Sequence, residues 1–164
     1  MIEVEVTQNI LDRARTKARE MGKLNNSITR GDGNIAGFIG EEIVSDFIGG
    51  EIKNTYDYDI VLGDETYDVK TKRCTSPPKS YYDCSVAAFN TKQKCDTYVF
   101  VRVQYVNNKF GPAWILGKKN KNDYFKQARK LSKGQIDPSN NFTVKADCYN
   151  LSIKELDILE TINE

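Results

Sequence analysis

Apolar residues in the first third of the chain recur at the three- and four-residue spacing of amphipathic helices. One helix is predicted over residues 7–21, with Thr7 as its N-cap and Gly22 just past its end. A second helix is predicted over residues 34–48, where a pair of glycines follows and ends it. The polar stretch 23–33 is expected to be a loop. The apolar stripe of the second helix consists of Ile35, Phe38, Ile39, Ile43, Val44, Phe47 and Ile48.

From there the pattern changes to the alternation and the β-branched composition that are typical of strands. Residues 58–62 and 66–72 are predicted to be two short strands joined by a turn at Gly63. The run TYVFVRVQYV at residues 97–106 is predicted to be a central strand, with a partner strand at 113–116.

The remaining segments mix both patterns. Residues 74–83 contain two consecutive prolines and are expected to form an irregular loop, 122–131 a helix rich in Lys and Arg, and 142–149 a last strand. A capping box from Ser152 to Glu155 is predicted to open a C-terminal helix that ends near Ile162. This order of elements predicts a single α/β domain over residues 1–164, with a central mixed β-sheet flanked by helices.

Composition excludes several kinds of site. The chain contains no histidine, which rules out a histidine general base, a Ser-His-Asp triad and a histidine-ligated zinc ion. No apolar stretch is long enough to span a membrane and the first residues lack a signal-peptide pattern, so a cytoplasmic location, in a bacterium or a phage-infected cell, is expected. The cysteines are expected to be packed thiols, with a zinc site made from all of them as the alternative: Cys74, Cys84, Cys95 and Cys148.

Basic residues concentrate in the middle of a chain whose net charge is only +1. Residues 68–133 hold 15 Lys and Arg against 4 Asp and Glu, whereas the rest of the chain holds 9 bases and 19 acids. Such a region can place one face against a polyanion, and a solvated lysine-rich surface is the alternative interpretation. The bases of the first helix are interpreted as a solvated flank: Arg13, Arg15, Lys17 and Arg19.

One group of residues carries candidate chemistry. Asp68 and Lys70 project from the same face of the second short strand, while Val69 points to the opposite face. Asp59, at the start of the adjoining strand, can lie beside Asp68 across the ladder. Two adjacent carboxylates repel unless a cation shares their site, and Mg²⁺ prefers such oxygen ligands. Lys70 could then orient or deprotonate the attacking water.

The segments around these residues resemble the motif of the PD-(D/E)XK nucleases. The helix sequence Gly37-Phe-Ile-Gly40-Glu41 is similar to the G-x-x-G-E helix of that family, and YDYDIVL and TYDVKTK are similar to the two strands that follow it. The similarity spans residues 34–73. It departs from the family pattern in two places, since no proline precedes the strand aspartate and an aspartate replaces the commoner glutamate before x-Lys. The site residues that the resemblance assigns are Glu41, Asp59, Asp68 and Lys70.

The resemblance implies a restriction-endonuclease-like fold and a function. Three acids would hold Mg²⁺, with Mn²⁺ as a substitute, and Lys70 would assist the attack of water on a DNA backbone. The expected protein is a compact endonuclease of the junction-resolvase kind, acting on DNA, with RNA as the other possible substrate and a homodimer as its expected state. Two assignments stay open, because Glu42 could replace Glu41 and Asp57 could replace Asp59.

Basic and polar side chains flank this site in sequence and are candidates for contacts with nucleic acid. Gln93 is also a candidate for a fourth active-site contact, and the Tyr81–Tyr82 pair could stack on bases. A catalytically inactive nucleic-acid-binding or assembly module on the same fold is the alternative function. The candidate nucleic-acid contacts are Lys72, Arg73, Lys92, Gln93, Lys94, Lys118, Lys119 and Lys121.

Overall fold

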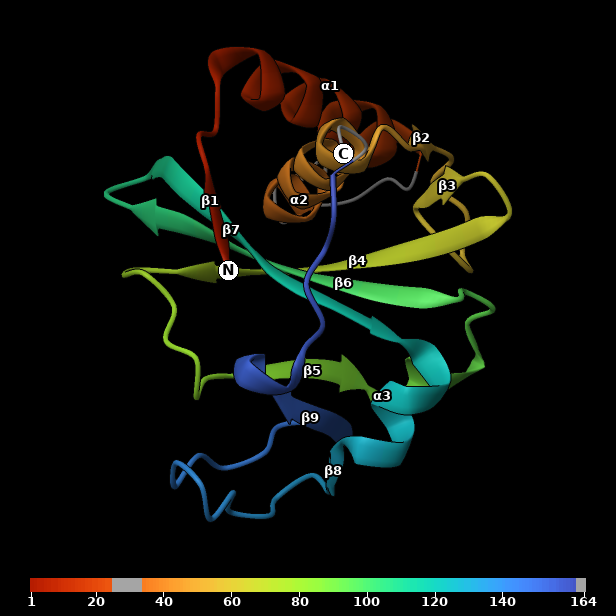
Figure 1. The fold of residues 1–164 in the computed structure, drawn as a ribbon. Helices are drawn as coiled ribbons and strands as arrows, with labels where there is room; N and C mark the ends of the chain where they lie inside the picture. The colour runs from red at the N-terminus through yellow and green to blue at the C-terminus, as the bar shows by residue number, and fades with distance from the viewer. Residues whose placement is uncertain (25–33, 162–164) are drawn as a thin grey trace.

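A mixed six-stranded sheet lies at the centre of the computed structural model, which describes residues 1–24 and 34–161 (Figure 1). Strands β4 and β6 run parallel, and the other neighbouring strands pair antiparallel. In spatial order the strands are β1 (Ile2–Val4), β7 (Lys109–Asn120), β6 (Thr97–Val106), β4 (Glu65–Cys74), β3 (Ile60–Leu62) and β2 (Glu51–Ile52).

Different elements cover the two faces of this sheet (Figure 1). Helices α1 (Gln8–Leu24) and α2 (Ile35–Ile48) pack on one face. A three-stranded antiparallel sheet and the short helix α3 (Lys121–Gln127) cover the other. None of the described helices is long and apolar enough to cross a membrane. The small sheet consists of β5 (Asp83–Ala87), β9 (Cys148–Ser152) and β8 (Arg129–Leu131), and two 3-10 turns are η2 (Ala88–Lys92) and η3 (Ile153–Glu155).

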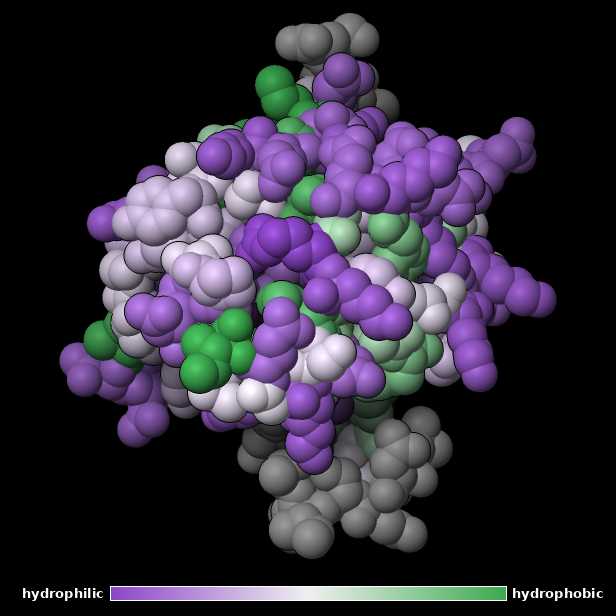
Figure 2. Space-filling model, turned by 90° about the horizontal axis from the view of Figure 1, so that it is seen from below, coloured by the Kyte–Doolittle hydropathy of each residue, from purple (hydrophilic) through white to green (hydrophobic). Residues whose placement is uncertain are grey.

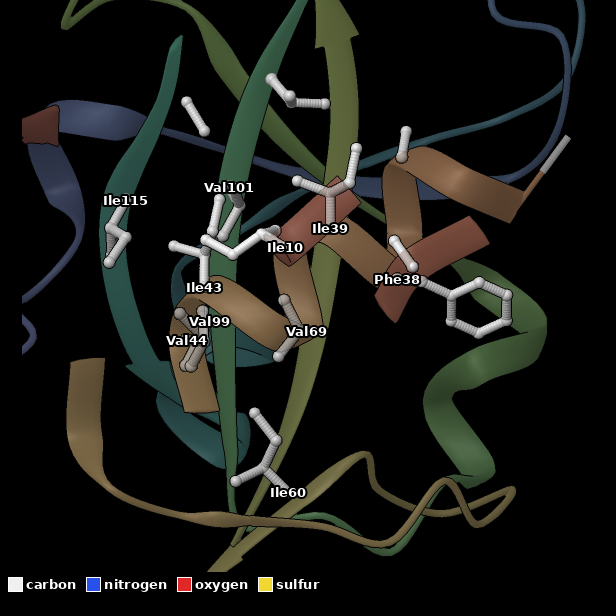
Figure 3. Close-up of a cluster of buried hydrophobic side chains, with 14 of the residues drawn as sticks. Ile10, Phe38, Ile39, Ile43, Val44, Ile60, Val69, Val99, Val101 and Ile115 are labelled. Carbon is white, nitrogen blue, oxygen red and sulfur yellow. The ribbon is translucent and has the colours of Figure 1, made fainter. Parts of the chain in front are cut away.

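The apolar stripe of α2 forms the core on the helix side of the sheet (Figure 3). Ile39 and Val44 are fully buried and lie against Val69 and Val99, which project from β4 and β6. Each such side chain contributes about 1.5–3 kcal/mol when it leaves water. The helix ends at Ile48, and the capping residue Gly49 has a left-handed φ of +68°, which glycine readily adopts. The helical period in the sequence therefore places α2 across β4, close to the predicted site.

The opposite face carries an aromatic core. Tyr98 and Phe100 of β6 pack against Tyr124 of α3. The hydroxyl of Tyr124 donates to the backbone oxygens of Cys84 (3.0 Å) and Tyr149 (2.6 Å), which joins α3 to the small sheet. Figure 2 shows that the molecular surface on this side is mostly hydrophilic, with separate hydrophobic patches.

The elements predicted for the first part of the chain are confirmed. The Thr7 hydroxyl accepts a hydrogen bond from the Ile10 amide (3.3 Å), as an N-cap does, and the predicted range of β6 matches the structure. Helix α1 does not stop at Gly22 but continues to Leu24. The predicted loop is helical at its first two residues, and the rest of it, 25–33, lies outside the described residues.

The last third of the chain differs from the prediction. Strand β7 extends well beyond 113–116 on both sides, because its pairing with β6 continues through two register shifts. The expected helix 122–131 ends at Gln127, and β8 takes its last residues. The predicted strand 142–149 is wrong, since β9 begins only at Cys148. Strands β1, β2 and β5 were not predicted, and β8 lies where a helix was expected.

The predicted C-terminal helix is also wrong. The capping box of Ser152 and Glu155 is present, yet it opens only the three-residue turn η3. The chain then runs extended along β7, where Asp157 exchanges two backbone hydrogen bonds with Lys118 (2.8 and 2.9 Å). Leu159 is only 4% exposed and joins the helix-side core. Burial of this leucine and the strand pairing override the local helix signal.

Candidate active site at the open edge of β4

Strand β4 has a free edge, and this edge positions the candidate site. Strand β3 pairs with β4 only from Glu65 to Tyr67, whereas β6 follows it to Cys74 on the other side. Within the described ranges no strand covers this edge beyond Tyr67. Asp59 comes immediately before β3, opposite Asp68 in the ladder. Its carboxylate accepts a hydrogen bond from the Val69 amide (2.7 Å) and so takes the place of a backbone partner on β3.

Asp68, Lys70 and Gln93 form a connected polar group beside Asp59. Asp68 is 4% exposed, and the Lys70 amine lies 2.5 Å from its Oδ2 atom. The Gln93 amide donates to Asp68 Oδ1 (3.2 Å) and to the Tyr56 carbonyl (3.0 Å), and its oxygen accepts from Lys70 (3.3 Å). Gln93 follows η2 directly and is itself buried. The residue that the sequence suggested as a fourth contact therefore touches both members of the D-x-K pair.

Glu41 reaches the same edge from α2. It is 8% exposed and pairs with Lys17 of α1 at 3.1 Å. With its amide oriented to satisfy both neighbours, Asn54 donates to Glu41 (2.6 Å) and accepts from Lys17 (2.6 Å). Glu42 instead faces α1, where it binds Arg13 at 2.8 Å. Of the two adjacent glutamates, Glu41 is the one whose charge acts on the strand aspartates.

The packing of α2 on β4 is closest just before Glu41. A Cβ atom at Gly40 would overlap the side chain of Thr71 on β4, whereas a Cβ atom at Gly37 would meet no atom within 4 Å. The second glycine of the G-x-x-G-E motif therefore lets the helix approach the strand and brings Glu41 to the open edge. We call Glu41, Asp59, Asp68 and Lys70 at this edge the acidic edge.

The three acids of the acidic edge repel one another. Burial, followed by the charges of Glu41 and Asp68, raises the pKa of Asp59 to about 7, against the hydrogen bond from Val69 and the charge of Lys70. Burial is also the main cause of the raised pKa of Glu41, which Lys17 partly offsets. Near neutral pH a fraction of Asp59 is therefore protonated, and a nearby cation would favour its ionised form.

The composition of the acidic edge fits a divalent cation bound by oxygen atoms. Asp59 and Asp68 lie across one ladder position, and the buried Asp68 Oδ2 has no hydrogen bond of good geometry, although Lys70 lies beside it. Over residues 1–24 and 34–161, no three acidic or cysteine side chains already converge on one point. The charges of Glu41 and Asp68 nevertheless act on Asp59, and Lys17 and Lys70 offset part of the negative charge.

Asp57, the alternative to Asp59, lies outside this group. Its carboxylate accepts from the Lys94 amide (3.0 Å) and so fixes the segment that carries Gln93. Lys92 and Lys94 are exposed on either side of Gln93. The amine of Lys121, one of the predicted basic residues, donates to the backbone carbonyl of Gln93. Lys121 therefore supports the residue that contacts Asp68 and Lys70.

The other predicted contacts are dispersed. Lys72 follows Lys70 on the same face of β4, while Arg73 lies 4.9 Å from the Tyr105 ring. Lys119 is only 7% exposed, and its amine binds the Glu155 carbonyl (3.1 Å) and the Asp157 carboxylate (3.3 Å). Lys119 and its neighbour Lys118 thus fix the C-terminal segment on β7. This placement leaves Lys119 outside any surface that phosphates could reach.

Two side chains beside the acidic edge were not predicted to belong there. Lys17 was interpreted as part of a solvated flank, but it pairs with Glu41 and lies 5.2 Å from the Phe38 ring centroid. Asn54 gave no sequence signal. Arg13 and Lys17 are one helical turn apart and pair with two successive acids of α2. That spacing could have suggested the contact between the helices.

The four cysteines have free thiols. Cys84 and Cys95 lie in the aromatic core, where burial raises the pKa of Cys84 to about 12 and that of Cys95 to about 11. Their thiols are therefore protonated at neutral pH and contribute to packing.

No family model matches the chain, and no curated protein matches it. The functional conclusion therefore depends on the arrangement of the side chains.

Proposed function

We propose that the chain is a metal-dependent nuclease of the PD-(D/E)XK type, with a restriction-endonuclease-like fold, which hydrolyses phosphodiester bonds in DNA as an endonuclease. One observation carries the proposal. Glu41 from the helix, Asp59 before one strand, and Asp68 and Lys70 on the next lie along the open edge of β4, where their charges act on one another. These elements and their order are those of the family motif that the sequence resembles.

The acids would share the task of binding the ion. Asp59 and Asp68 would be its main protein ligands, with Glu41 as the third, and Mg²⁺ or Mn²⁺ suits this set of oxygens. When bound, such an ion supplies Lewis-acid polarisation of the phosphate and lowers the pKa of a coordinated water. Without it, the three carboxylates would repel the phosphate group of a substrate.

Lys70 would act on the reacting groups directly. Its amine could donate a hydrogen bond to a phosphate oxygen and orient the attacking water. Attack of the water oxygen on phosphorus forms one P–O bond and breaks the bond to the leaving oxygen; the attacking water gives up one proton to the solvent, and the leaving oxygen takes one up. Gln93 is a positioning residue in this scheme, since it holds both Lys70 and Asp68.

Nucleic acid would approach over the basic side chains near the site. Lys72 follows Lys70 on β4, and Lys92 and Lys94 are exposed beside Gln93. Lysines so placed could contact phosphates on either side of the scissile bond without reading the base sequence. DNA is the expected substrate, and RNA would present the same phosphates.

A catalytically inactive nucleic-acid-binding or assembly module is the second candidate. It is favoured by one observation, namely that Lys17 and Lys70 already pair with two of the three acids. In such a module these ion pairs would be structural and no ion would be needed. The two candidates make opposite predictions about metal dependence.

The experiment that separates them is a cleavage assay on supercoiled, linear, branched and single-stranded DNA. The purified chain should cut at least one of these substrates in the presence of Mg²⁺ or Mn²⁺ and none in EDTA. An Asp68→Asn preparation, purified in parallel, controls for contaminating nucleases. No cleavage of any substrate with either ion would contradict the proposed nuclease and favour the binding module.

A further inference from the structure

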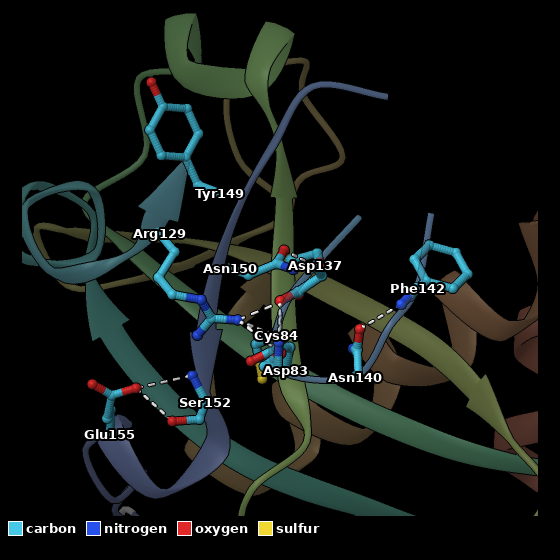
Figure 4. Close-up of polar contacts among 12 residues, drawn as sticks. Asp83, Cys84, Arg129, Asp137, Asn140, Phe142, Tyr149, Asn150, Ser152 and Glu155 are labelled. Carbon is cyan, nitrogen blue, oxygen red and sulfur yellow. Dashed lines mark hydrogen bonds and ion pairs between the residues drawn. The ribbon is translucent and has the colours of Figure 1, made fainter. Parts of the chain in front are cut away.

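A groove of about 790 Å³ runs beside the small sheet, and its lining contains none of the four residues of the acidic edge. Strands β5 and β9 line it on one side, and the loop between β8 and β9 lines it on the other. Within this loop the Asp137 carboxylate accepts hydrogen bonds from the amide (2.9 Å) and the hydroxyl (2.8 Å) of Ser139. The loop wall is therefore held by its own hydrogen bonds and by Arg129, which bridges Asp137 to β5 (Figure 4).

Charge in this groove is mainly positive. Both acids of its lining, Asp83 and Asp137, pair with Arg129, at 2.9 and 3.5 Å (Figure 4). The other four basic residues of the groove lining form no ion pair within the described residues. They are Lys72, Arg102, Lys145 and Lys154, and we call the hollow that they line the basic groove.

Exposed aromatic rings lie beside these basic residues. Tyr81 is 62% exposed and Phe142 is 53% exposed, and both line the basic groove. The Lys145 amine lies 6.0 Å from the Phe142 ring centroid, and the Arg102 guanidinium lies 6.0 Å from that of Tyr82. Aromatic rings between cations are the combination on which successive bases stack while their phosphates are neutralised.

The basic groove is continuous with the acidic edge. Lys72 lines the groove, the hollow of about 460 Å³ that contains Lys70, and the hollow of about 560 Å³ that contains Glu41. Lys72 and Lys70 are two residues apart on β4, so they project from one face about 6–7 Å apart. Arg102 lines both the groove and the hollow beside Lys70. A chain lying in the groove would thus reach the acidic edge at Lys72.

We propose that the basic groove binds a single-stranded nucleic acid and guides it to the acidic edge. The inference rests on the proposed nuclease function and names its substrate as a single strand or the single-stranded part of a branched molecule. A duplex keeps its bases stacked inside the helix, so the exposed rings of Tyr81 and Phe142 would have no base face to contact. A single strand offers both free base faces and phosphates.

The test measures binding of the full chain in EDTA by fluorescence anisotropy. The probes are labelled oligo-dT, oligo-rU and a mixed-sequence duplex DNA, so that DNA and RNA strands are distinguished. Phe142→Ala should weaken binding of the single strands by about fivefold or more and leave duplex binding unchanged. Phe89, an exposed ring on η2 outside the groove, provides the matched control Phe89→Ala.

A charge variant tests the same surface independently. Replacing Lys145 and Lys154 together by Ala should lower the log–log salt slope for single strands by roughly 0.7 for each phosphate that is no longer neutralised. The control replaces Lys109 and Lys126, which are exposed outside the groove, and should leave the slope unchanged. Each of three results would overturn the inference. They are a wild-type chain that binds neither single strand, groove variants that bind the single strands as the wild type does, and groove variants whose duplex binding is weakened as much as their single-strand binding.

Failure of the inference and failure of the proposed function can be told apart. If the groove variants no longer bind single strands but the wild-type chain cuts no nucleic acid with Mg²⁺, the groove is a binding surface and the proposed nuclease fails. If the wild-type chain cuts with Mg²⁺ and the groove variants bind and cut single strands normally, the nuclease stands and the groove assignment fails.

Discussion

The acidic edge of β4 and the basic groove meet at Lys72 but are built in opposite ways. The acids are mostly buried, and each is held by a specific neighbour, as Glu41 is by Lys17 and Asp68 by Lys70 and Gln93. In the groove, Lys72, Lys145 and Lys154 are exposed and Arg102 is half-buried, while the aromatic rings of Tyr81 and Phe142 are more than half exposed. Buried groups that share partners couple strongly, whereas exposed and separated groups contribute nearly independently.

This difference separates two kinds of effect. A change at the acidic edge alters the protonation or position of its neighbours, so we expect it to act on turnover and on stability. The charges of the groove and of the exposed lysines are screened by salt. A change there should act on affinity, in proportion to the number of phosphates contacted.

The largest expected effect follows from Lys70→Ala and Asp68→Asn. Each should lower the cleavage rate by about a hundredfold to ten-thousandfold, the range typical of general acid–base groups, while DNA binding is kept. Asp68→Asn should even tighten binding, because it removes a negative charge that faces the phosphate. Single-turnover cleavage and anisotropy on the same preparations measure the two quantities.

Lys53→Ala is the matched control, since the Lys53 side chain is exposed and its amine pairs with Glu51 and with no acid of the acidic edge. It should cleave at the wild-type rate. Equal cleavage by the wild type, Lys70→Ala and Asp68→Asn in Mg²⁺ would remove the acidic edge from catalysis.

The next effect concerns the pH dependence of stability. The pKa of Asp59 is about 7 in the folded chain, above the value of about 3.9 for an unfolded aspartate. The folded state therefore binds more protons than the unfolded state between these two pKa values. Protonation of Asp59 thus stabilises the fold, fully below the lower pKa, and this stabilisation is lost as pH rises through about 7. For an isolated group the shift would correspond to at most about 4 kcal/mol.

Asp59→Asn should flatten this dependence, because an amide carries no charge and its oxygen can still accept from the Val69 amide. The variant should gain stability relative to the wild type between pH 5 and pH 8, as measured by urea denaturation. Asp57→Asn is the control and should follow the wild-type curve. A constant difference between wild type and Asp59→Asn over this range would show that Asp59 titrates normally.

A smaller effect on stability comes from the contact between α2 and β4. Gly40→Ala should destabilise the fold by about 1–3 kcal/mol, since the new Cβ atom overlaps Thr71, and it should displace Glu41. Gly37→Ala, three residues earlier in open space, should be neutral or stabilising by about 0.5–1 kcal/mol. Denaturant unfolding of the two variants gives the comparison, and equal stability would show that the close approach is not required.

The smallest effect is expected from Lys92 and Lys94. If both contact duplex phosphates, replacing the pair by Ala should lower the salt slope by about 0.9 per lysine and leave cleavage at saturating DNA unchanged. Affinities measured from low to high salt provide the slope. An unchanged slope would make these lysines a solvated surface and would place the duplex contacts elsewhere.

The helix side of the fold could be predicted from the sequence because its signals are regular. Residues such as Ile39 and Val44 recur with the helical period, and the run that forms β6 is strongly β-prone. The acidic edge could be located for a related reason. Asp68 and Lys70 alternate with Val69 on one strand, and a short turn fixes Asp59 opposite Asp68.

The small sheet and the C-terminus could not be predicted, because their structure depends on distant partners. Strand β9 forms between β5 and β8, each of which is short and has little pattern of its own. The segment after Glu155 carries a helix signal, yet Leu159 is buried in a core that only the folded sheet provides. Lys17 likewise meets Glu41 only after the two helices pack. The basic groove, which is built partly from the small sheet and the segments around it, therefore had no sequence signal beyond Lys72, Tyr81 and Tyr82.

Binding of Mn²⁺ in the absence of nucleic acid tests the central claim most directly. Titration calorimetry should detect Mn²⁺ binding to the wild-type chain at pH 8, strong weakening in Asp59→Asn and Asp68→Asn, and weakening in Glu41→Gln but not in Glu42→Gln or Asp57→Asn. This result would assign the ion to the acidic edge. Absence of binding to the wild type, or equal binding by all five variants, would contradict a metal-dependent site formed by Glu41, Asp59 and Asp68.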